Sequence, residues 1–130
     1  MILLGHKFIP SESLYHVEDI DAIEHTPPSS TLYLEFSQER LDIINHARVN
    51  NINFALKVKN IKELIYASSL DAKYIIVPKN MAKTAQDIAE NYLFDAKILV
   101  HTDDDKEIEE MALLGIDGLI YPNTIVKVNS

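Results

Sequence analysis

The chain has 130 residues, of which 47% are hydrophobic and 25% charged; this composition is typical of one globular domain and too apolar for a disordered chain. Its formal net charge of −8 argues against binding to nucleic acid or to an anionic membrane surface, because both ligands require a basic face. The absence of cysteine excludes disulfides, a thiolate nucleophile and any zinc site built on cysteine ligands.

The first 30 residues are predicted to form an irregular segment that packs on the rest of a single domain, residues 1–130. Residues 1–10 indicate a short strand with a bend at Gly5. The apolar start is too short for a signal peptide, and no stretch approaches the roughly 18 apolar residues of a membrane span. We therefore expect a cytoplasmic protein that does not enter membranes. Pro27 and Pro28 predict an extended connection before the first regular element.

From Thr31 onward, short apolar runs alternate with helical patterns. Strands are predicted at 31–36, 53–58, 73–77, 97–100 and 118–121, and helices near 37–49, 60–68, 81–93 and 105–114. Strands joined by single helices form right-handed crossovers, which place the strands parallel. The predicted fold class is α/β with five to six mainly parallel strands. Two architectures fit this pattern: a half-barrel-like sheet, and an open Rossmann-like or flavodoxin-like sheet.

Two stretches resemble units of (βα)8-barrel families. Glu109–Pro122 (EEMALLGIDGLIYP) is similar to the closing helix and strand of the glycerophosphodiester phosphodiesterases and of the small aldolases that cleave keto-deoxy-phosphogluconate. The match lies in a glycine, hydrophobic, aspartate, glycine step at residues 115–118, and Phe54–Pro78 looks like two successive units of such a barrel. The resemblance implies TIM-barrel-like repeats over about half of the chain.

The catalytic motifs of these families are not found. The phosphodiesterase resemblance implies a His-Arg pair after the first strand, but His6 is followed by Lys7. It also implies a Glu-x-Asp step after the second strand, but Glu35 is followed by Phe36 and Ser37. The aldolase resemblance implies an imine-forming lysine beside a phosphate-binding loop, and no glycine-rich loop is present. We therefore carry over no catalytic residue.

Ligands of parallel α/β folds bind at the carboxyl ends of the strands, so polar residues at those ends are the first site candidates. Five of them recur every 22 residues: Glu35, Lys57, Lys79, His101 and Asn123. The regular spacing predicts that they share one rim of the sheet. The alternative is that polar residues simply occur wherever a repeated strand reaches water.

Lys57 and Lys59 alternate with Val58 and are therefore expected on one side of their strand. A half-buried lysine there can act as a base, form an imine or bind an anionic ligand, whereas two lysines at a sheet margin with solvated heads have no chemical role. The solvated arrangement explains the sequence more simply. Lys59 and Asn123 remain candidates for ligand binding.

The acidic run His101–Asp105 suggests either a divalent cation site or the start of a helix. Consecutive aspartates splay apart, whereas carboxylates in a first helical turn are stabilised by the helix dipole. The helix start explains more residues, so we predict no metal site. With three glycines in the chain, phosphate-binding loops of the Walker or dinucleotide type are excluded, and we predict no cofactor.

These residues suggest two alternative functions. The lack of a catalytic constellation favours a non-enzymatic protein-interaction or structural domain, with a homodimer as one form of it. The alternative is a degenerate or minimal barrel-type enzyme, or a binder of small anions such as phosphorylated metabolites, that uses the carboxyl rim of the strands. Whether the chain is an enzyme is left open, and the first alternative is favoured.

Overall fold

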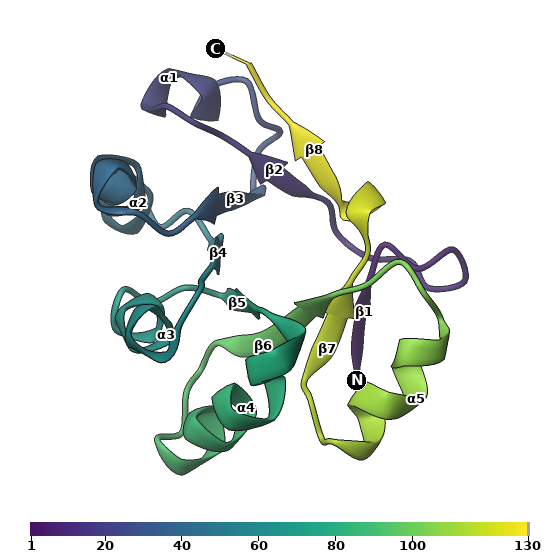
Figure 1. Ribbon diagram of the computed structural model, residues 1–130. Coiled ribbons are helices and arrows are strands. Elements are labelled where there is room, and N and C mark those ends of the chain that lie inside the picture. The colour runs from purple at the N-terminus through teal and green to yellow at the C-terminus, as the bar shows by residue number, and fades with distance from the viewer. Residues whose placement is uncertain (130) are drawn as a thin grey trace.

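A computed structural model describes residues 1–129, which form one curled sheet with helices along its outer side (Figure 1). The strands are β1 (Ile2–Leu4), β2 (Leu14–His16), β3 (Thr31–Glu35), β4 (Phe54–Lys57), β5 (Tyr74–Val77), β6 (Lys97–His101), β7 (Gly118–Ile120) and β8 (Ile125–Lys127). The α-helices are α1 (Ile20–Ile23), α2 (Leu41–Val49), α3 (Ile61–Ser69), α4 (Ala82–Asn91) and α5 (Lys106–Leu113). Three 3₁₀ turns are η1 (Gln38–Arg40), η2 (Lys79–Met81) and η3 (Pro122–Thr124).

All neighbouring strands run parallel, in the order β1-β7-β6-β5-β4-β3-β2-β8. Strands β2 to β7 follow one another sequentially, which confirms the α/β class and the half-barrel alternative; the open sheet with a reversal of strand order is wrong. The expected count of five to six strands is also wrong, since the sheet has eight. The unexpected strands, β2 and β8, have three residues each and are too short to show a period in the sequence.

Residues 121–124 connect β7, which lies next to one edge of the sheet, to β8, the strand at the opposite edge. They lead from β7, which pairs with β1 and β6, directly into β8, which pairs with β2. The Tyr121 N–H donates to the Leu4 carbonyl at 2.8 Å, so this segment also stays attached to the end of β1. The sheet therefore curls back toward itself, and its two ends approach each other beside η3 (Figure 1).

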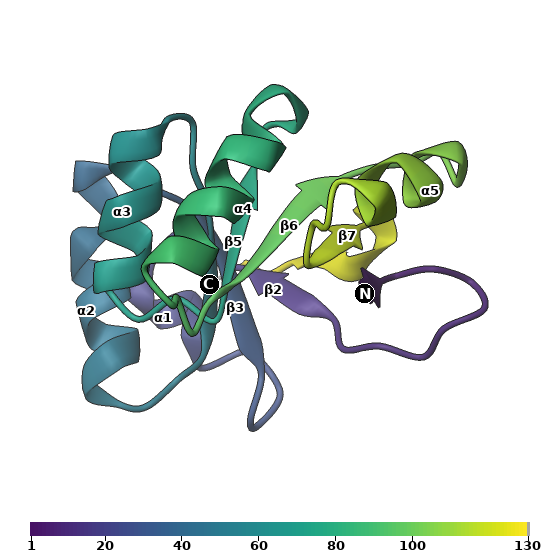
Figure 2. The ribbon, with the colours of Figure 1, turned by 90° about the horizontal axis from the view of Figure 1, so that it is seen from below.

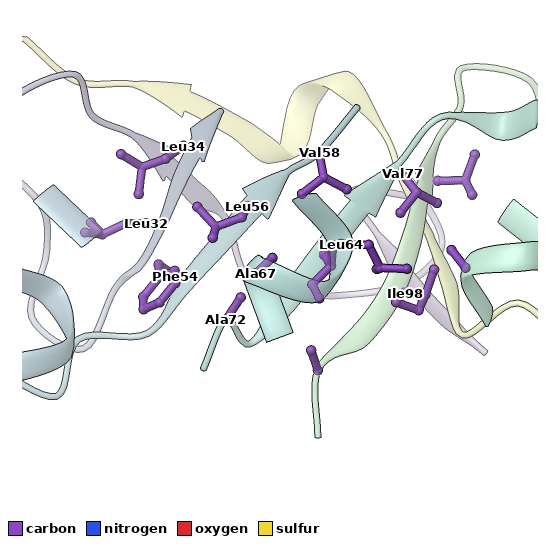
Figure 3. Packing of buried hydrophobic residues seen from close by; sticks show 14 of the residues in the cluster. Leu32, Leu34, Phe54, Leu56, Val58, Leu64, Ala67, Ala72, Val77 and Ile98 are labelled. Atoms are coloured by element: carbon purple, nitrogen blue, oxygen red, sulfur yellow. The ribbon is translucent and has the colours of Figure 1, made fainter. Parts of the chain in front are cut away.

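The two faces of the sheet have separate apolar clusters. The convex cluster packs against the helices and includes Leu34, Leu56 and Leu64, all fully buried (Figure 3). In Figure 2, α1 to α4 stand along β2 to β6, while α5 lies beside β7. The concave cluster contains Leu4, Leu14, Tyr33, Ala55, Tyr74, Ile76, Leu99 and Ile120. These residues come from seven strands and are at most 7% exposed, and none of the helices in the described chain lies over them. The curled sheet therefore wraps around its own side chains.

The helices of the repeated units end in the same turn. The residue that terminates each of α2 to α5 has a positive φ: Asn51 (55°), Asp71 (69°), Leu93 (54°) and Gly115 (77°). The N–H of the next residue then donates to the carbonyl five residues back, in the pairs Ile52–Ala47, Ala72–Ala67, Phe94–Ala89 and Ile116–Met111. This is the Schellman type of cap, and it explains the regular spacing of the units. The predicted cap at Gly115 is confirmed.

The Asp117-Gly118 step fixes β1 against β6 and β7. A Cβ atom added at Gly118 would lie 2.4 Å from the Ile2 carbonyl oxygen, so no larger residue fits without moving the backbone. The Asp117 carboxylate accepts a hydrogen bond from the Ile98 N–H at 2.9 Å, and the Asp117 N–H donates to Oε1 of Gln86 at 3.0 Å. Asp117 and Gly118 thus have an architectural role.

Glu12 covers the amino-terminal end of the concave face. Its carboxylate accepts hydrogen bonds from Thr31 Oγ1 at 2.7 Å, from Tyr74 Oη at 2.6 Å and from Lys73 Nζ at 2.9 Å. Burial by itself raises the pKa of Glu12, but the hydrogen bonds from Tyr74, Lys73 and Thr31 outweigh it and hold the pKa below its ordinary value.

Among residues 1–129, no helix combines the length and the apolar character required to cross a bilayer.

Candidate functional site

Three of the residues predicted from the 22-residue spacing lie on the concave face at the carboxyl ends of their strands. Alternation along β3 and β4 puts Leu34 and Leu56 on the convex face, so Glu35 and Lys57 point the other way. His101 ends β6 on the same face. Together with Tyr33 of β3, these residues form what we call the rim cluster.

Tyr33 and His101 form the floor of the rim cluster. The Tyr33 hydroxyl and the His101 Nε2 share a long hydrogen bond of 3.4 Å, and Tyr33 is only 4% exposed. The His16 ring of β2 packs edge-on against Tyr33, with ring centroids 5.2 Å apart and planes at 83°. A phenol thus lies between two imidazoles at the bottom of the site.

Burial and nearby charges keep both floor residues neutral at physiological pH. Burial, with a further contribution from the Glu35 carboxylate, raises the pKa of Tyr33 to about 12. Burial also lowers the pKa of His101 below its ordinary value, and the positive charge of Lys57 lowers it further. Glu35 lies two residues after Tyr33 on the same face of β3, and Lys57 and His101 end β4 and β6 on either side of β5.

Glu35 and Lys57 stand above this floor as side-by-side charges. They are register partners on adjacent strands β3 and β4, and both side chains are exposed. Within residues 1–129, neither of them takes part in an ion pair. One negative and one positive group are therefore free to contact a solute at this end of the sheet.

The other predicted site residues lie elsewhere. Lys79 is in η2, and its ammonium contacts Glu107 Oε2 at 2.6 Å and Glu110 Oε2 at 3.2 Å, so it binds α5 rather than the rim cluster. Lys59 follows β4 and is exposed; its N–H donates to Glu63 Oε1 at 2.9 Å, next to the start of α3.

Asn123 lines a separate hollow of about 530 Å³ between the end of β1 and the start of α5. We call it the α5 hollow; its other lining residues are Gly5, His6, Lys7, Asp103, Asp104, Asp105 and Tyr121. The 22-residue period therefore brings together Glu35, Lys57 and His101, but it does not bring Lys79 or Asn123 to them.

The α5 hollow contains a hydrogen-bonded chain that the sequence analysis missed. His6 Nδ1 accepts from the Phe8 N–H at 3.1 Å, so Nε2 carries the proton and donates to Asp105 Oδ2 at 3.2 Å. Tyr121 donates to the other oxygen of Asp105 at 2.7 Å. The Tyr121 hydrogen bond, and then that of His6, lowers the pKa of Asp105, while burial and the Asp105 carboxylate raise the pKa of Tyr121 to about 12.

The aspartates at the α5 hollow lie at the start of α5, and the side chain of its N-cap residue, Asp105, makes no capping hydrogen bond. Asp104 Oδ1 accepts from the Lys106 N–H at 2.9 Å, and Glu107 accepts from the Thr102 hydroxyl at 2.7 Å. In the part of the chain that the structure describes, no group of three or more His, Cys, Asp or Glu side chains is arranged to hold a metal ion. Through Asp105, the start of α5 is hydrogen-bonded to His6, which follows β1, and to Tyr121, which follows β7.

The sequence analysis also missed Tyr33 and His16. A signal for Tyr33 exists, because it alternates with Leu32 and Leu34 and so shares a face with Glu35. His16 has no such signal, since β2 consists of three residues in a stretch without clear alternation.

Comparison with known proteins adds no family assignment. The sequence matches no protein-family model, and no curated protein resembles it closely enough to count as a relative. The geometry of the rim cluster is therefore the basis for a functional proposal.

Proposed function

We propose that this protein is a binding domain for a small anionic molecule, and that the rim cluster is its binding site. The observation that carries the proposal is the position of Lys57: an exposed ammonium group without an ion pair among the described residues, at the carboxyl end of β4 and on the same concave face as His101. Ligand sites of parallel α/β folds occur at this end. Other exposed lysines of the described residues, such as Lys62, also lack an ion pair, so the place of Lys57 at the carboxyl end of β4 is what distinguishes it.

The groups around Lys57 support a carboxylate or a phosphate as the anion. Lys57 supplies the charge, and the neutral His101 ring and the Tyr33 hydroxyl supply hydrogen-bonding atoms on the same concave face. Tyr33 is held by its burial and by His16, so these atoms lose little freedom on binding. The proposed resemblance to barrel enzymes is not required for this function and stays a prediction.

Isothermal titration calorimetry with inorganic phosphate and with acetate tests the proposal. We expect millimolar binding that Lys57→Ala weakens about threefold to fivefold, the range of one exposed ion pair. Lys62→Ala is the matched control, because Lys62 is an exposed lysine of α3, a helix on the convex side. Equal binding by wild type, Lys57→Ala and Lys62→Ala would contradict the proposal, as would a complete lack of binding by the wild type.

A second candidate function is self-association, for which an apolar groove is the specific observation. The groove has a volume of about 470 Å³ and is lined by Phe36, Gln38, Leu41, Tyr66, Ser69 and Leu70. Tyr66 is 46% exposed and packs against Phe36 with ring centroids 5.9 Å apart. Sedimentation velocity over a wide concentration range tests it: a dimer that Tyr66→Lys dissociates would support this function, and a strictly monomeric wild type would remove it.

A further inference from the structure

We infer that the ligand of the rim cluster carries an ammonium group as well as its anionic group, as a free α-amino acid does. This inference rests on the proposed function and adds the chemical class of the ligand. It comes from Glu35, the second exposed charge of the site, which has no role in binding a simple anion.

The arrangement of Glu35 and Lys57 is unusual for two opposite charges on a sheet. They are register partners on neighbouring strands, where backbones lie about 4.8 Å apart and side chains leave the sheet in the same direction. Opposite charges in such positions commonly pair across the strands. Here neither carboxylate oxygen of Glu35 lies within 4.0 Å of the Lys57 ammonium, so both groups face the solvent beside the same floor. A solute with both charges can bridge them.

The floor residues indicate which end of a zwitterion binds where. His101 and Lys57 end β6 and β4 on the concave face, on either side of β5, and the imidazole ring can donate a hydrogen bond to a carboxylate that the lysine attracts. Tyr33 and Glu35 are two residues apart on β3 and share its concave face, and the Tyr33 hydroxyl oxygen can accept a hydrogen bond from an ammonium group. The carboxylate is therefore assigned to the Lys57 and His101 side, and the ammonium group to the Glu35 and Tyr33 side.

A simple anion alone would experience Glu35 as a repulsive neighbour. The carboxylate stands one strand away from the ammonium that attracts the anion, and like charges at this spacing weaken binding. A ligand that brings its own positive charge turns this repulsion into an attraction. The pair therefore discriminates between a zwitterion and an anion of the same size.

Glycine and acetate are suitable probes, because they share a carboxylate and differ by one ammonium group. We expect NMR titrations at constant ionic strength to show glycine binding to the wild type about threefold to fivefold more tightly than acetate, the range of one exposed ion pair. Glu35→Gln should abolish this preference and retain acetate binding. Lys57→Met should weaken the binding of both probes, and circular dichroism should show that both variants remain folded.

The outcomes separate this inference from the function on which it rests. If acetate binds as tightly as glycine to the wild type, or if Glu35→Gln keeps the preference for glycine, the ligand is a simple anion; the inference is then overturned and the proposed function stands. If neither probe nor inorganic phosphate binds, both fail together.

Discussion

Tyr33 and His101 are 3.4 Å apart at their hydroxyl and Nε2 atoms, although β4 and β5 lie between their strands in the sheet. A flat sheet would keep these side chains far apart, since each strand adds about 4.8 Å. Their contact therefore depends on the curl of the sheet. The same curl brings Glu35 and Lys57 to the edge of a shared floor.

Removing the charge of Lys57 should change the titration of His101. Burial and Lys57 both lower the pKa of His101, so Lys57→Met should raise this pKa toward the ordinary value of 6.5 while burial keeps it below. NMR titration of the imidazole protons measures it. Lys62→Met should leave the His101 pKa unchanged, and an unchanged pKa in Lys57→Met would show that the two groups are not close.

The lowered pKa of His101 also predicts how stability depends on pH. The unfolded chain takes up a proton near pH 6.5, whereas the folded chain does so only at lower pH. Between these values the unfolded state binds more protons, so the contribution of neutral His101 is fully present above pH 6.5 and decreases as the pH falls toward the folded pKa. The free energy of unfolding, measured in urea, should decrease over this pH range in the wild type and decrease less in Lys57→Met.

Substitution of Gly118 should be far more destabilising than substitution of Gly115. An added Cβ at Gly118 would collide with the Ile2 carbonyl oxygen at 2.4 Å, so Gly118→Ala should cost about 3 kcal/mol or more. At Gly115 nothing lies within 4 Å of the added atom, and only the positive φ of 77° opposes alanine, at a cost of about 1 kcal/mol. Chemical denaturation of both variants checks the order, and equal costs would contradict it.

The substitution Leu93→Gly should stabilise the protein by about 0.5–1 kcal/mol, because Leu93 adopts a φ of 54° that glycine tolerates better. Leu93 is 84% exposed, so little buried area is lost. The matched control is Leu113→Gly at the end of α5, where the side chain is 81% exposed but the backbone is helical. That variant should lose about 0.5–1 kcal/mol. The midpoints of thermal and urea unfolding should rise for Leu93→Gly and fall for Leu113→Gly.

Glu12 should stabilise the amino-terminal end of the concave face through its charge. Glu12→Gln should cost about 1–2 kcal/mol at neutral pH, because three donors lose a carboxylate acceptor. The pKa of Glu12 is lower in the folded chain than in the unfolded chain, so its contribution is present above the ordinary value of 4.5 and decreases as the pH falls through the folded pKa. The difference in free energy of unfolding between the wild type and Glu12→Gln should therefore become smaller at acidic pH. Glu39→Gln, at an exposed position in η1, is the control.

The repeated part of the fold was predictable because its signals are local. Apolar runs and helical spacing predict β3 to β7 and the helices between them, and Gly115 is recognisable as a cap because glycine favours a positive φ. The choice between the curled sheet and the open one was not predictable, since it depends on β8 reaching β2 through residues 121–124. Those strands have three residues each, and a pairing between distant segments leaves no local pattern.

The candidate site was predictable to the extent that it follows the strand period. Glu35, Lys57 and His101 share the rim because they end strands that run in the same direction. Lys79 falls at the same interval, but its strand ends two residues earlier, and α5 offers it Glu107 and Glu110 as partners. The contact of Tyr33 with His101 follows from the curvature of the sheet and could not be inferred from spacing.

The claim that an anion binds over Tyr33, Lys57 and His101 is tested most directly by mapping where it binds. Sodium phosphate can be titrated into ¹⁵N-labelled protein at constant ionic strength while amide and imidazole shifts are recorded. We expect saturable shifts at the ends of β3, β4 and β6 and at the His101 ring, all reduced in Lys57→Ala. Shifts confined to the α5 hollow near Lys7 and Asn123, or the absence of saturable shifts, would contradict the claim.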